Sequence, residues 1–386
     1  MKKKTLYILL SILSLIVLAT VGKCIHVSIR MQGIGSFETE KEDLLQRRAF
    51  LLEKVVTTPE NLIKEMPSAV GPIFQNEWAM YSCSMLSAAL VNMSRLYPET
   101  REESMVSIDS LIRIVMSKEL RNYDAVRWGE DPLESLDGSN SHISYISILA
   151  WMIGGYKTLG GDGRYDSLWD SLCETMSRRF YDSPNFNLLT YPDVYVYVPD
   201  ELVGIAALSI YARFHDGRYR DTVDYWIKNM KENWTDATGM IASLFPDMEC
   251  KPGDFLYVLG SYSALICYYM TFVDVDYARA LYDVLKTKFV KRSPFAGIRE
   301  YWYKNSLLDF NIDAGPVIFN LSPSGTAFGI GPATYFEDWE IRNLFLKTAE
   351  IAGTTVIRKG KRHYLLADIA LVGEAITLAM RTAVHW

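Results

Sequence analysis

The chain has 386 residues, of which 49% are hydrophobic and 22% are charged, and its formal net charge is −6. This length allows one large domain with a sizeable core, and the composition excludes a disordered chain. The acidic balance argues against a nucleic-acid partner. The five cysteines form no CxxC pair and the five histidines form no HExxH motif. We therefore expect no disulfide framework, no metal site and no cofactor.

The N-terminus carries three lysines followed by an uncharged apolar run. Lys2, Lys3 and Lys4 precede residues 5–22, in which Leu, Ile and Val dominate. Such a run is just long enough to span a membrane, and basic flanking residues stay on the cytoplasmic side. We predict a cytoplasmic end at 1–4 and one transmembrane helix at 5–22, and we favour an uncleaved anchor over a cleaved signal peptide. The remaining domain would be extracytoplasmic, in the periplasm, and held at the cell membrane.

Residues 23–65 are predicted as a juxtamembrane segment with an amphipathic helix at 36–57, and residues 66–386 as the main domain. In this domain one pattern recurs: a helix of small and apolar residues, a tight turn, an amphipathic helix and a long loop. Helices that are apolar on nearly every side are expected to be buried on nearly every side. The first helix of each pair begins near residues 76, 141, 200, 255, 322 and 365.

The spacing of these starts, roughly 45–65 residues, is typical of helical hairpins that close into a ring. We predict an all-α fold, an (α/α)6 toroid or barrel, in which the juxtamembrane helix supplies the partner that the last inner helix lacks. Only residues 194–199 and 361–366 are expected to be extended, as short pieces. The long loops would gather at one rim, over the central cavity, where a ligand site belongs.

Three residues of this rim are candidate catalytic groups. His142 lies at the start of an inner helix, where it is either an acid–base group or a packed core histidine. Asp200 lies where a helix N-cap is wanted, so capping is the alternative to catalysis. Asp313 lies in the turn NIDAGP, and with Asp309 it would form an acid and base pair. The alternative interpretation is that Asp313 only stabilises the turn.

Acidic and aromatic side chains of the same loops are candidate substrate-binding groups. The aromatic ones would stack on a ligand or simply pack the loops. Glu77 opens the first inner helix, where it either reaches the cavity or complements the helix dipole. The predicted substrate-binding residues are Glu77, Trp128, Asp193, Tyr195, Tyr197, Glu300, Trp302 and Asp309.

Four segments resemble the linalool dehydratase/isomerase-like proteins: WGEDP (128–132), SHISYISILAWMIGGYKTLGGDGRY (141–165), YPDVYVY (191–197) and LLDFNIDAG (307–315). The resemblance covers roughly residues 75–340. It implies an extracytoplasmic (α/α)6 barrel that adds water to, or removes it from, a terpene alcohol by acid–base chemistry.

The resemblance also bears on individual site residues. His142 falls on the family's active-site histidine. The two active-site cysteines of the family are matched here by Tyr191 (or Thr190) and Asp200, so Tyr191 joins the candidate catalytic residues. The acidic residue that the family uses ahead of its first inner helix has no clear counterpart at 66–75, although Glu77 is close.

Three functions are compatible with these features. The first is an acid–base enzyme, a carbon–oxygen lyase, hydratase or isomerase, acting on an organic molecule with a hydroxyl group. The second is a glycan-active hydrolase, lyase or epimerase, since carboxylates among aromatic residues fit carbohydrate. The third is a non-catalytic envelope protein that binds a ligand. The expected partners are a small organic or carbohydrate ligand and, through the N-terminal helix, the membrane.

Overall fold

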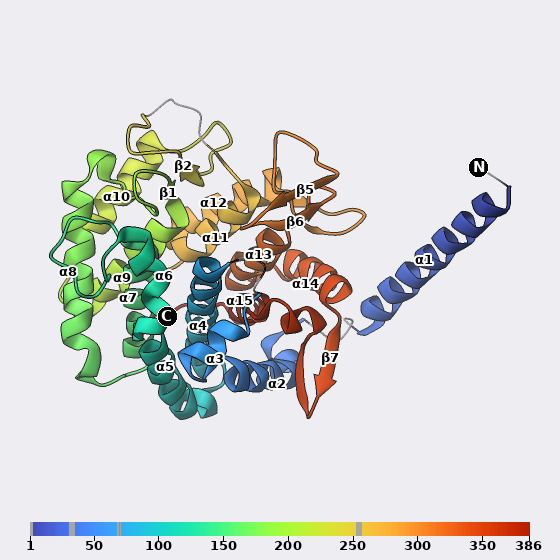
Figure 1. Ribbon diagram of the computed structural model, residues 1–386, viewed down its shortest axis with the longest axis horizontal. Coiled ribbons are helices and arrows are strands. Elements are labelled where there is room, and N and C mark those ends of the chain that lie inside the picture. The colour runs from blue at the N-terminus through green and yellow to red at the C-terminus, as the bar shows by residue number, and fades with distance from the viewer. Residues whose placement is uncertain (1–2, 31–34, 68, 70, 252–256) are drawn as a thin grey trace.

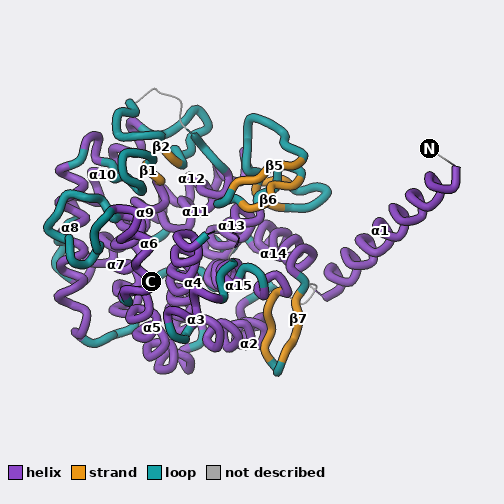
Figure 2. Tube along the Cα trace, in the orientation of Figure 1, coloured by secondary structure: helices purple, strands orange, loops and turns teal. Residues whose placement is uncertain are grey.

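The computed structural model describes residues 3–30, 35–67, 69, 71–251 and 257–386. Fifteen α-helices and eight short strands lie in these residues, and helices dominate the fold (Figure 2). The chain is therefore mostly helical, as its apolar periodicity predicts.

Six helices rich in small and apolar residues form a closed inner ring. Each contacts the next along the chain, and the last contacts the first (Figure 1). In the second of them every residue from Ile143 to Tyr156 is buried, because neighbours cover it on all sides. The ring consists of α4 (Pro72–Leu96), α7 (Ile143–Thr158), α9 (Val198–Phe214), α11 (Gly260–Met270), α13 (Pro323–Tyr335) and α15 (Leu371–Arg381).

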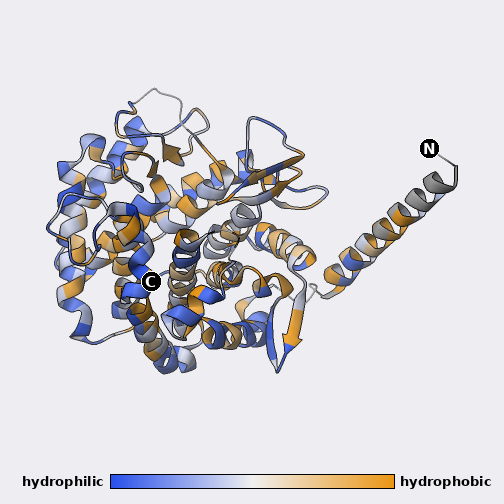
Figure 3. Cartoon of the chain, in the orientation of Figure 1, coloured by the Kyte–Doolittle hydropathy of each residue, from blue (hydrophilic) through white to orange (hydrophobic). Residues whose placement is uncertain are grey.

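An outer helix packs on each inner helix. These outer helices are amphipathic, and α10, for example, buries residues at helical spacing (Val223, Trp226, Ile227 and Met230) while its opposite face is polar (Figure 3). In ring order the outer helices are α5 (Arg101–Met116), α8 (Asp166–Asp182), α10 (Arg220–Asn233), α12 (Val275–Lys288), α14 (Trp339–Gly353) and α2 (Phe37–Val55). The last of these, α2, contacts both α15 and α4.

Aromatic side chains fill the ring at the C-terminal ends of the inner helices. The indole rings of Trp151 and Trp386 stack at 4.9 Å, and Phe272 packs edge-on against both. The indole Nε1 of Trp386 donates a hydrogen bond to Asn92 Oδ1 at 2.6 Å. This end is closed, so open space is left toward the N-terminal ends of the inner helices.

Shorter elements complete the chain. These are α3 (Pro59–Lys64), α6 (Lys118–Trp128), η3 (Pro98–Thr100), η4 (Gly163–Tyr165), η5 (Pro184–Phe186) and η6 (Leu365–Asp368). The strands pair antiparallel as β1 (Val196–Tyr197) with β2 (Leu244–Phe245), β3 (Val290–Lys291) with β4 (Gly297–Ile298), β5 (Leu308–Asn311) with β6 (Gly315–Ile318), and β7 (Thr355–Arg358) with β8 (Lys361–Tyr364). β1 and β8 lie in the segments expected to be extended, whereas the β5–β6 hairpin replaces part of an expected loop.

The expected transmembrane helix at residues 5–22 is wrong. A spanning helix needs about 20 predominantly apolar residues in succession. In the part of the chain that the structure describes, no helix has the combination of length and apolar character that crossing a membrane requires. The expected fold, a toroid preceded by a membrane-spanning helix, is corrected accordingly. The location at the cell membrane with an extracytoplasmic domain stays a prediction.

Residues 5–22 belong instead to α1 (Lys3–Arg30), which extends away from the ring (Figure 1). Its C-terminal part contacts α14. There, Val27 is buried and Lys23 Nζ donates a hydrogen bond to Thr354 Oγ1 at 2.6 Å.

Candidate functional site

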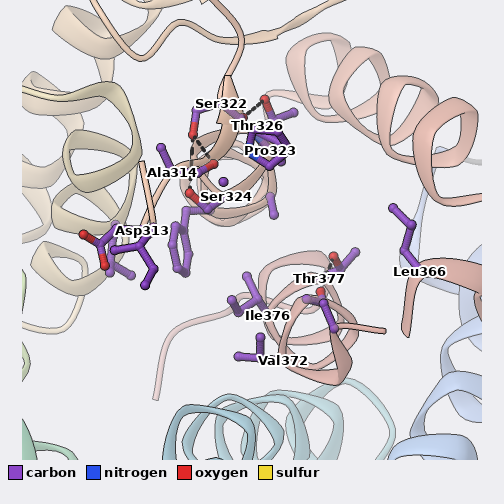
Figure 4. A pocket seen from close by; sticks show the side chains of 18 of the residues that line it. Asp313, Ala314, Ser322, Pro323, Ser324, Thr326, Leu366, Val372, Ile376 and Thr377 are labelled. Carbon is purple, nitrogen blue, oxygen red and sulfur yellow. Dashed lines mark hydrogen bonds between the residues drawn. The ribbon is translucent and has the colours of Figure 1, made fainter. Parts of the chain in front are cut away.

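A cavity of about 860 Å³ lies among the inner helices and the β5–β6 hairpin. Its lining comes from α4, α9, α11, α13, α14, η6 and α15, and most of the lining side chains are apolar. Figure 4 shows Asp313 at one side of this cavity and Leu366 at the other, with side chains of α13 and α15 between them. Carboxyl and phenol groups are concentrated at the Asp313 side, which we call the acid end, defined by Glu77, Asp200 and Asp313.

Glu77 enters the acid end from the second turn of α4. Arg127 of α6 donates from Nη2 to Glu77 Oε2 at 3.1 Å, and its guanidinium lies 4.2 Å from the ring centre of Tyr191. Burial raises the pKa of Glu77 to about 7, against the opposing charge of Arg127, and Asp200 adds to the rise. The carboxyl faces the cavity rather than only complementing the helix dipole.

Asp200 enters the acid end from the first turn of α9. Tyr81 donates its hydroxyl to Oδ1 at 3.0 Å, and Thr190 donates to Oδ2 at 3.1 Å. Burial raises the pKa of Asp200 to about 6, although both hydrogen bonds favour the charged form. Asp200 is not the helix N-cap: Tyr197 holds that position and makes no side-chain cap bond. The capping alternative is therefore wrong.

Asp313 lies in the turn between β5 and β6, opposite the two inner helices. It is hydrogen-bonded to Tyr262 of α11 and lines the cavity, where part of its surface is open to solvent. Burial among protein atoms raises its pKa, and its charge in turn raises the pKa values of Glu77 and Asp200. The charges of the three carboxyls therefore act on one another.

Tyrosines surround these carboxyls. The rings of Tyr191 and Tyr197 line the cavity with centres 5.9 Å apart, and Tyr197 and Tyr262 are 5.5 Å apart. Tyr195, which contacts both Tyr191 and Tyr197, is largely exposed and is not among the described lining residues. Burial and nearby carboxylates raise the phenol pKa values of Tyr191, Tyr197 and Tyr262. These tyrosines are therefore protonated hydrogen-bond donors at neutral pH.

His142 does not lie in this cavity. Its ring is fully buried, with Nδ1 2.5 Å from Asp124 Oδ2 and Nε2 within 3.3 Å of both Glu130 Oε1 and Ser135 Oγ. The described residues that line the cavity do not include it. The structure therefore does not bring His142 together with Asp200 and Asp313, because polar partners hold its ring beneath the 129–141 loop.

The other predicted binding residues also lie outside the cavity lining. Trp128 packs against the His142 ring at 5.4 Å. Glu300 is buried and accepts hydrogen bonds from Ser261 N and Oγ, at the start of α11. Asp309, on β5, accepts a hydrogen bond from the Tyr301 hydroxyl. It is not among the described lining residues, so the expected pair of Asp309 with Asp313 in the cavity is not formed. Asp193 sits in an exposed turn with a positive φ of 64°, and Trp302 is 39% exposed in the 299–307 loop.

Sequence reasoning missed four groups of the site: Tyr81, Arg127, Thr190 as a donor, and Tyr262. Tyr81 follows Glu77 by four residues on one helix, so that helical spacing alone would have placed it on the same face. Tyr262 lies in the first turn of an inner helix, the position that had directed attention to Asp200. Arg127 had no such signal, because the sequence analysis predicts no helix at the position of α6.

The acid end has the parts needed for proton transfer. Burial raises the pKa values of all three carboxyls, to about 7 for Glu77 and about 6 for Asp200, and phenols and one guanidinium offer hydrogen bonds and a positive charge. In the described part of the chain, no three His, Cys, Asp or Glu side chains are grouped so that they could hold a metal ion.

No protein-family model matches the chain, and no curated protein matches it. The resemblance to linalool dehydratase/isomerase-like proteins thus stays a prediction from the four segments that carry it.

Proposed function

We propose that this protein is an acid–base enzyme that removes water from, adds water to, or isomerises an organic molecule carrying a hydroxyl group. The observation that supports this proposal is the gathering of Glu77, Asp200 and Asp313 at one end of a mostly apolar cavity. Burial keeps protons on this group near neutral pH, so that both an acid and a base are available at once.

In this proposal Asp200 and Asp313 exchange protons with the substrate. One carboxylic acid protonates the departing hydroxyl as the carbon–oxygen bond breaks, and the other, as a carboxylate, takes a proton from the neighbouring carbon. Water and an alkene result, and the reverse steps add water. Glu77, whose pKa is raised to about 7, lies beside these two carboxyls with Arg127 and takes up or releases a proton as the charge of the site changes. Tyr81 and Thr190 orient the Asp200 carboxyl.

The apolar lining distinguishes this proposal from a glycan-active enzyme. A sugar presents hydroxyl groups on most of its edges and needs polar partners along the whole site, whereas here the polar groups are concentrated at the acid end. A purely binding protein has no need for three interacting carboxyls in an apolar cavity, where burying them costs stability.

The test is solvent deuterium incorporation. Purified protein is incubated in D2O with a panel of tertiary and allylic alcohols and the corresponding alkenes, and the products are analysed by mass spectrometry. We expect Asp200→Asn and Asp313→Asn each to lower the rate about a hundredfold or more. Asp309→Asn, in the same hairpin but outside the cavity lining, is the matched control and should keep full activity.

Two results would contradict the proposal. The first is absence of deuterium incorporation and of water exchange across the whole panel. The second is equal activity of Asp200→Asn, Asp313→Asn and the control. Hydrolysis of nitrophenyl glycosides that depends on the same carboxyls would instead support the glycan-active alternative.

A further inference from the structure

The cavity is larger than the acid end alone requires. Its volume of about 860 Å³ is in the upper part of the range of small-molecule sites, roughly 300–1,000 Å³. The space continues from Asp313 past α13 and α15 to Leu366 of η6 (Figure 4). We call this part the apolar arm, defined by Phe328, Ala349, Ile351, Leu366, Val372 and Ile376.

Three polar side chains along the apolar arm, Thr326, Glu374 and Thr377, are already hydrogen-bonded within the protein. Thr377 donates its hydroxyl to the Gly373 carbonyl at 2.8 Å, and Thr326 donates to the Ser322 carbonyl at 2.7 Å. Glu374 accepts from Arg47 Nη1 and from the Tyr364 backbone N–H, both at 2.7 Å. The arm therefore offers a ligand mainly methyl and methylene groups, and it favours hydrocarbon over any polar chain.

The far end of the apolar arm reaches the protein surface. Leu366 is 50% exposed and Ile369 is 65% exposed, and both line the cavity. A chain that is longer than the arm would leave the protein there without meeting a closed wall. The acid end has the opposite character, since Asp200 is buried and its two hydrogen-bond partners, Tyr81 and Thr190, come from different parts of the chain.

We propose that the substrate is a long-chain alcohol lipid, whose hydroxyl group lies at the acid end and whose hydrocarbon chain fills the apolar arm. This inference rests on the proposed function for the role of the hydroxyl, but it concerns the length of the substrate, which binding alone reports. A compact alcohol of about ten carbons would leave much of this space unfilled.

Binding of a series of straight-chain alcohols tests the inference. Isothermal titration calorimetry is carried out with alcohols of increasing chain length, below their solubility limits. We expect the affinity to rise about fourfold for each added methylene group until the arm is full. The alkane of equal length, which lacks the hydroxyl, should bind more weakly than each alcohol.

A variant that blocks the arm provides the second measurement. Ala349→Trp places a large side chain in the arm from α14, away from the acid end. It should abolish the gain in affinity for long alcohols and leave short alcohols unaffected, and Val372→Phe provides the same block if Ala349→Trp does not fold. Val106→Trp, at a site on α5 that is 65% exposed, is the control and should bind like the unmodified protein.

The outcomes separate this inference from the proposed function. Affinity that does not rise with chain length, or a block that weakens short and long alcohols equally, overturns the inference even if alcohols react. A rising, block-sensitive affinity with no turnover of any alcohol supports the inference on chain length and contradicts the proposed function.

Discussion

At the scale of single residues, burial controls the charge of the cavity carboxyls. The pKa of Asp200 is raised to about 6 in the folded protein, from about 3.9 in an unfolded chain. The folded state then binds the proton more tightly than the unfolded state does. The stability that this proton binding contributes is complete below the unfolded pKa, and it is lost as the pH rises through about 6.

Replacement of Asp200 by Asn should therefore change the pH dependence of stability. Above about pH 7 the charged carboxylate costs about 3 kcal/mol, and Asp200→Asn removes this cost. The melting temperature of the variant, relative to the unmodified protein, should rise steadily from about pH 4 to about pH 8. Differential scanning calorimetry across this range measures it. Asp309→Asn serves as control, because the Asp309 carboxyl of the unmodified protein has a lowered pKa. If the difference in melting temperature between Asp200→Asn and the unmodified protein did not change with pH, the prediction would be contradicted.

His142 gives the second prediction at this scale. Its imidazole is the partner of Asp124, and both side chains are fully buried. In His142→Ala the Asp124 carboxyl loses this partner, which we expect to cost about 3 kcal/mol or more of the free energy of unfolding. Urea denaturation measures the loss. If His142→Ala instead abolished turnover without lowering stability, His142 would act in catalysis, as the family resemblance implies.

At the scale of elements, the sequence was informative wherever helices repeat. The inner helices begin within six residues of the predicted starts, because a buried helix needs apolar residues on all faces. The predicted start near residue 255 itself lies outside the described residues. Asp274 and Asp338 stand just before outer helices and cap them by accepting from Tyr277 N and Ile341 N, as Asp commonly does there. These features depend on local patterns, which a single sequence displays directly.

The candidate site was less predictable, because it depends on which loops approach one another. Asp200 and Asp313 were identified, yet their grouping depends on the β5–β6 hairpin, whose strands were not expected from the sequence. His142 was misplaced, because a helix start shows where a backbone lies but not which way its side chain turns. The length of α1 was likewise underestimated, and the expected span at 5–22 was wrong.

The hairpin itself can be tested at Gly315. This residue has a φ of +76°, a conformation that costs other residues about 1 kcal/mol or more. Gly315→Ala should strain the turn and shift Asp313, lowering deuterium incorporation while the melting temperature changes little. Gly360→Ala is a matched control, because Gly360 has a φ of +74° in the β7–β8 turn. Equal losses of activity in both variants would contradict a specific role of the β5–β6 turn.

At the scale of the whole molecule, a buried ionic network closes the ring. Glu40 of α2 accepts hydrogen bonds from Arg342 of α14 at 2.6 and 2.8 Å and from Arg381 of α15 at 2.7 Å. Arg381 also pairs with Asp43, and Arg47 joins Asp43 to Glu374. These contacts hold α2, the first helix of the ring, against α14 and α15, the last two. The two ends of the ring domain therefore stabilise one another.

The carboxyls of the ionic network and those of the cavity make stability depend on pH in opposite directions. The charges of Arg381 and Arg342 lower the pKa of Glu40 against the effect of burial, and Arg381 and Arg47 do the same for Asp43. A lowered folded pKa contributes stability above the ordinary carboxyl pKa, and this stability is lost as the pH falls. The stability that the cavity carboxyls contribute is instead lost as the pH rises. Together they predict a stability maximum close to the ordinary carboxyl pKa, between about pH 4 and about pH 5.

A double-mutant cycle tests whether the network links the two ends of the domain. Arg342→Met removes the main partner of buried Glu40 and should lower the free energy of unfolding by about 3–5 kcal/mol. The double variant Glu40→Met/Arg342→Met carries no such unpaired charge, so it should be no less stable than Arg342→Met alone. Urea denaturation of the single and double variants measures the coupling.

The control is Arg292→Met, which breaks an exposed ion pair with Glu340 and should change the free energy of unfolding little. Additive losses in the double variant would show that Glu40 and Arg342 act independently, and the ring would then be held closed by apolar packing.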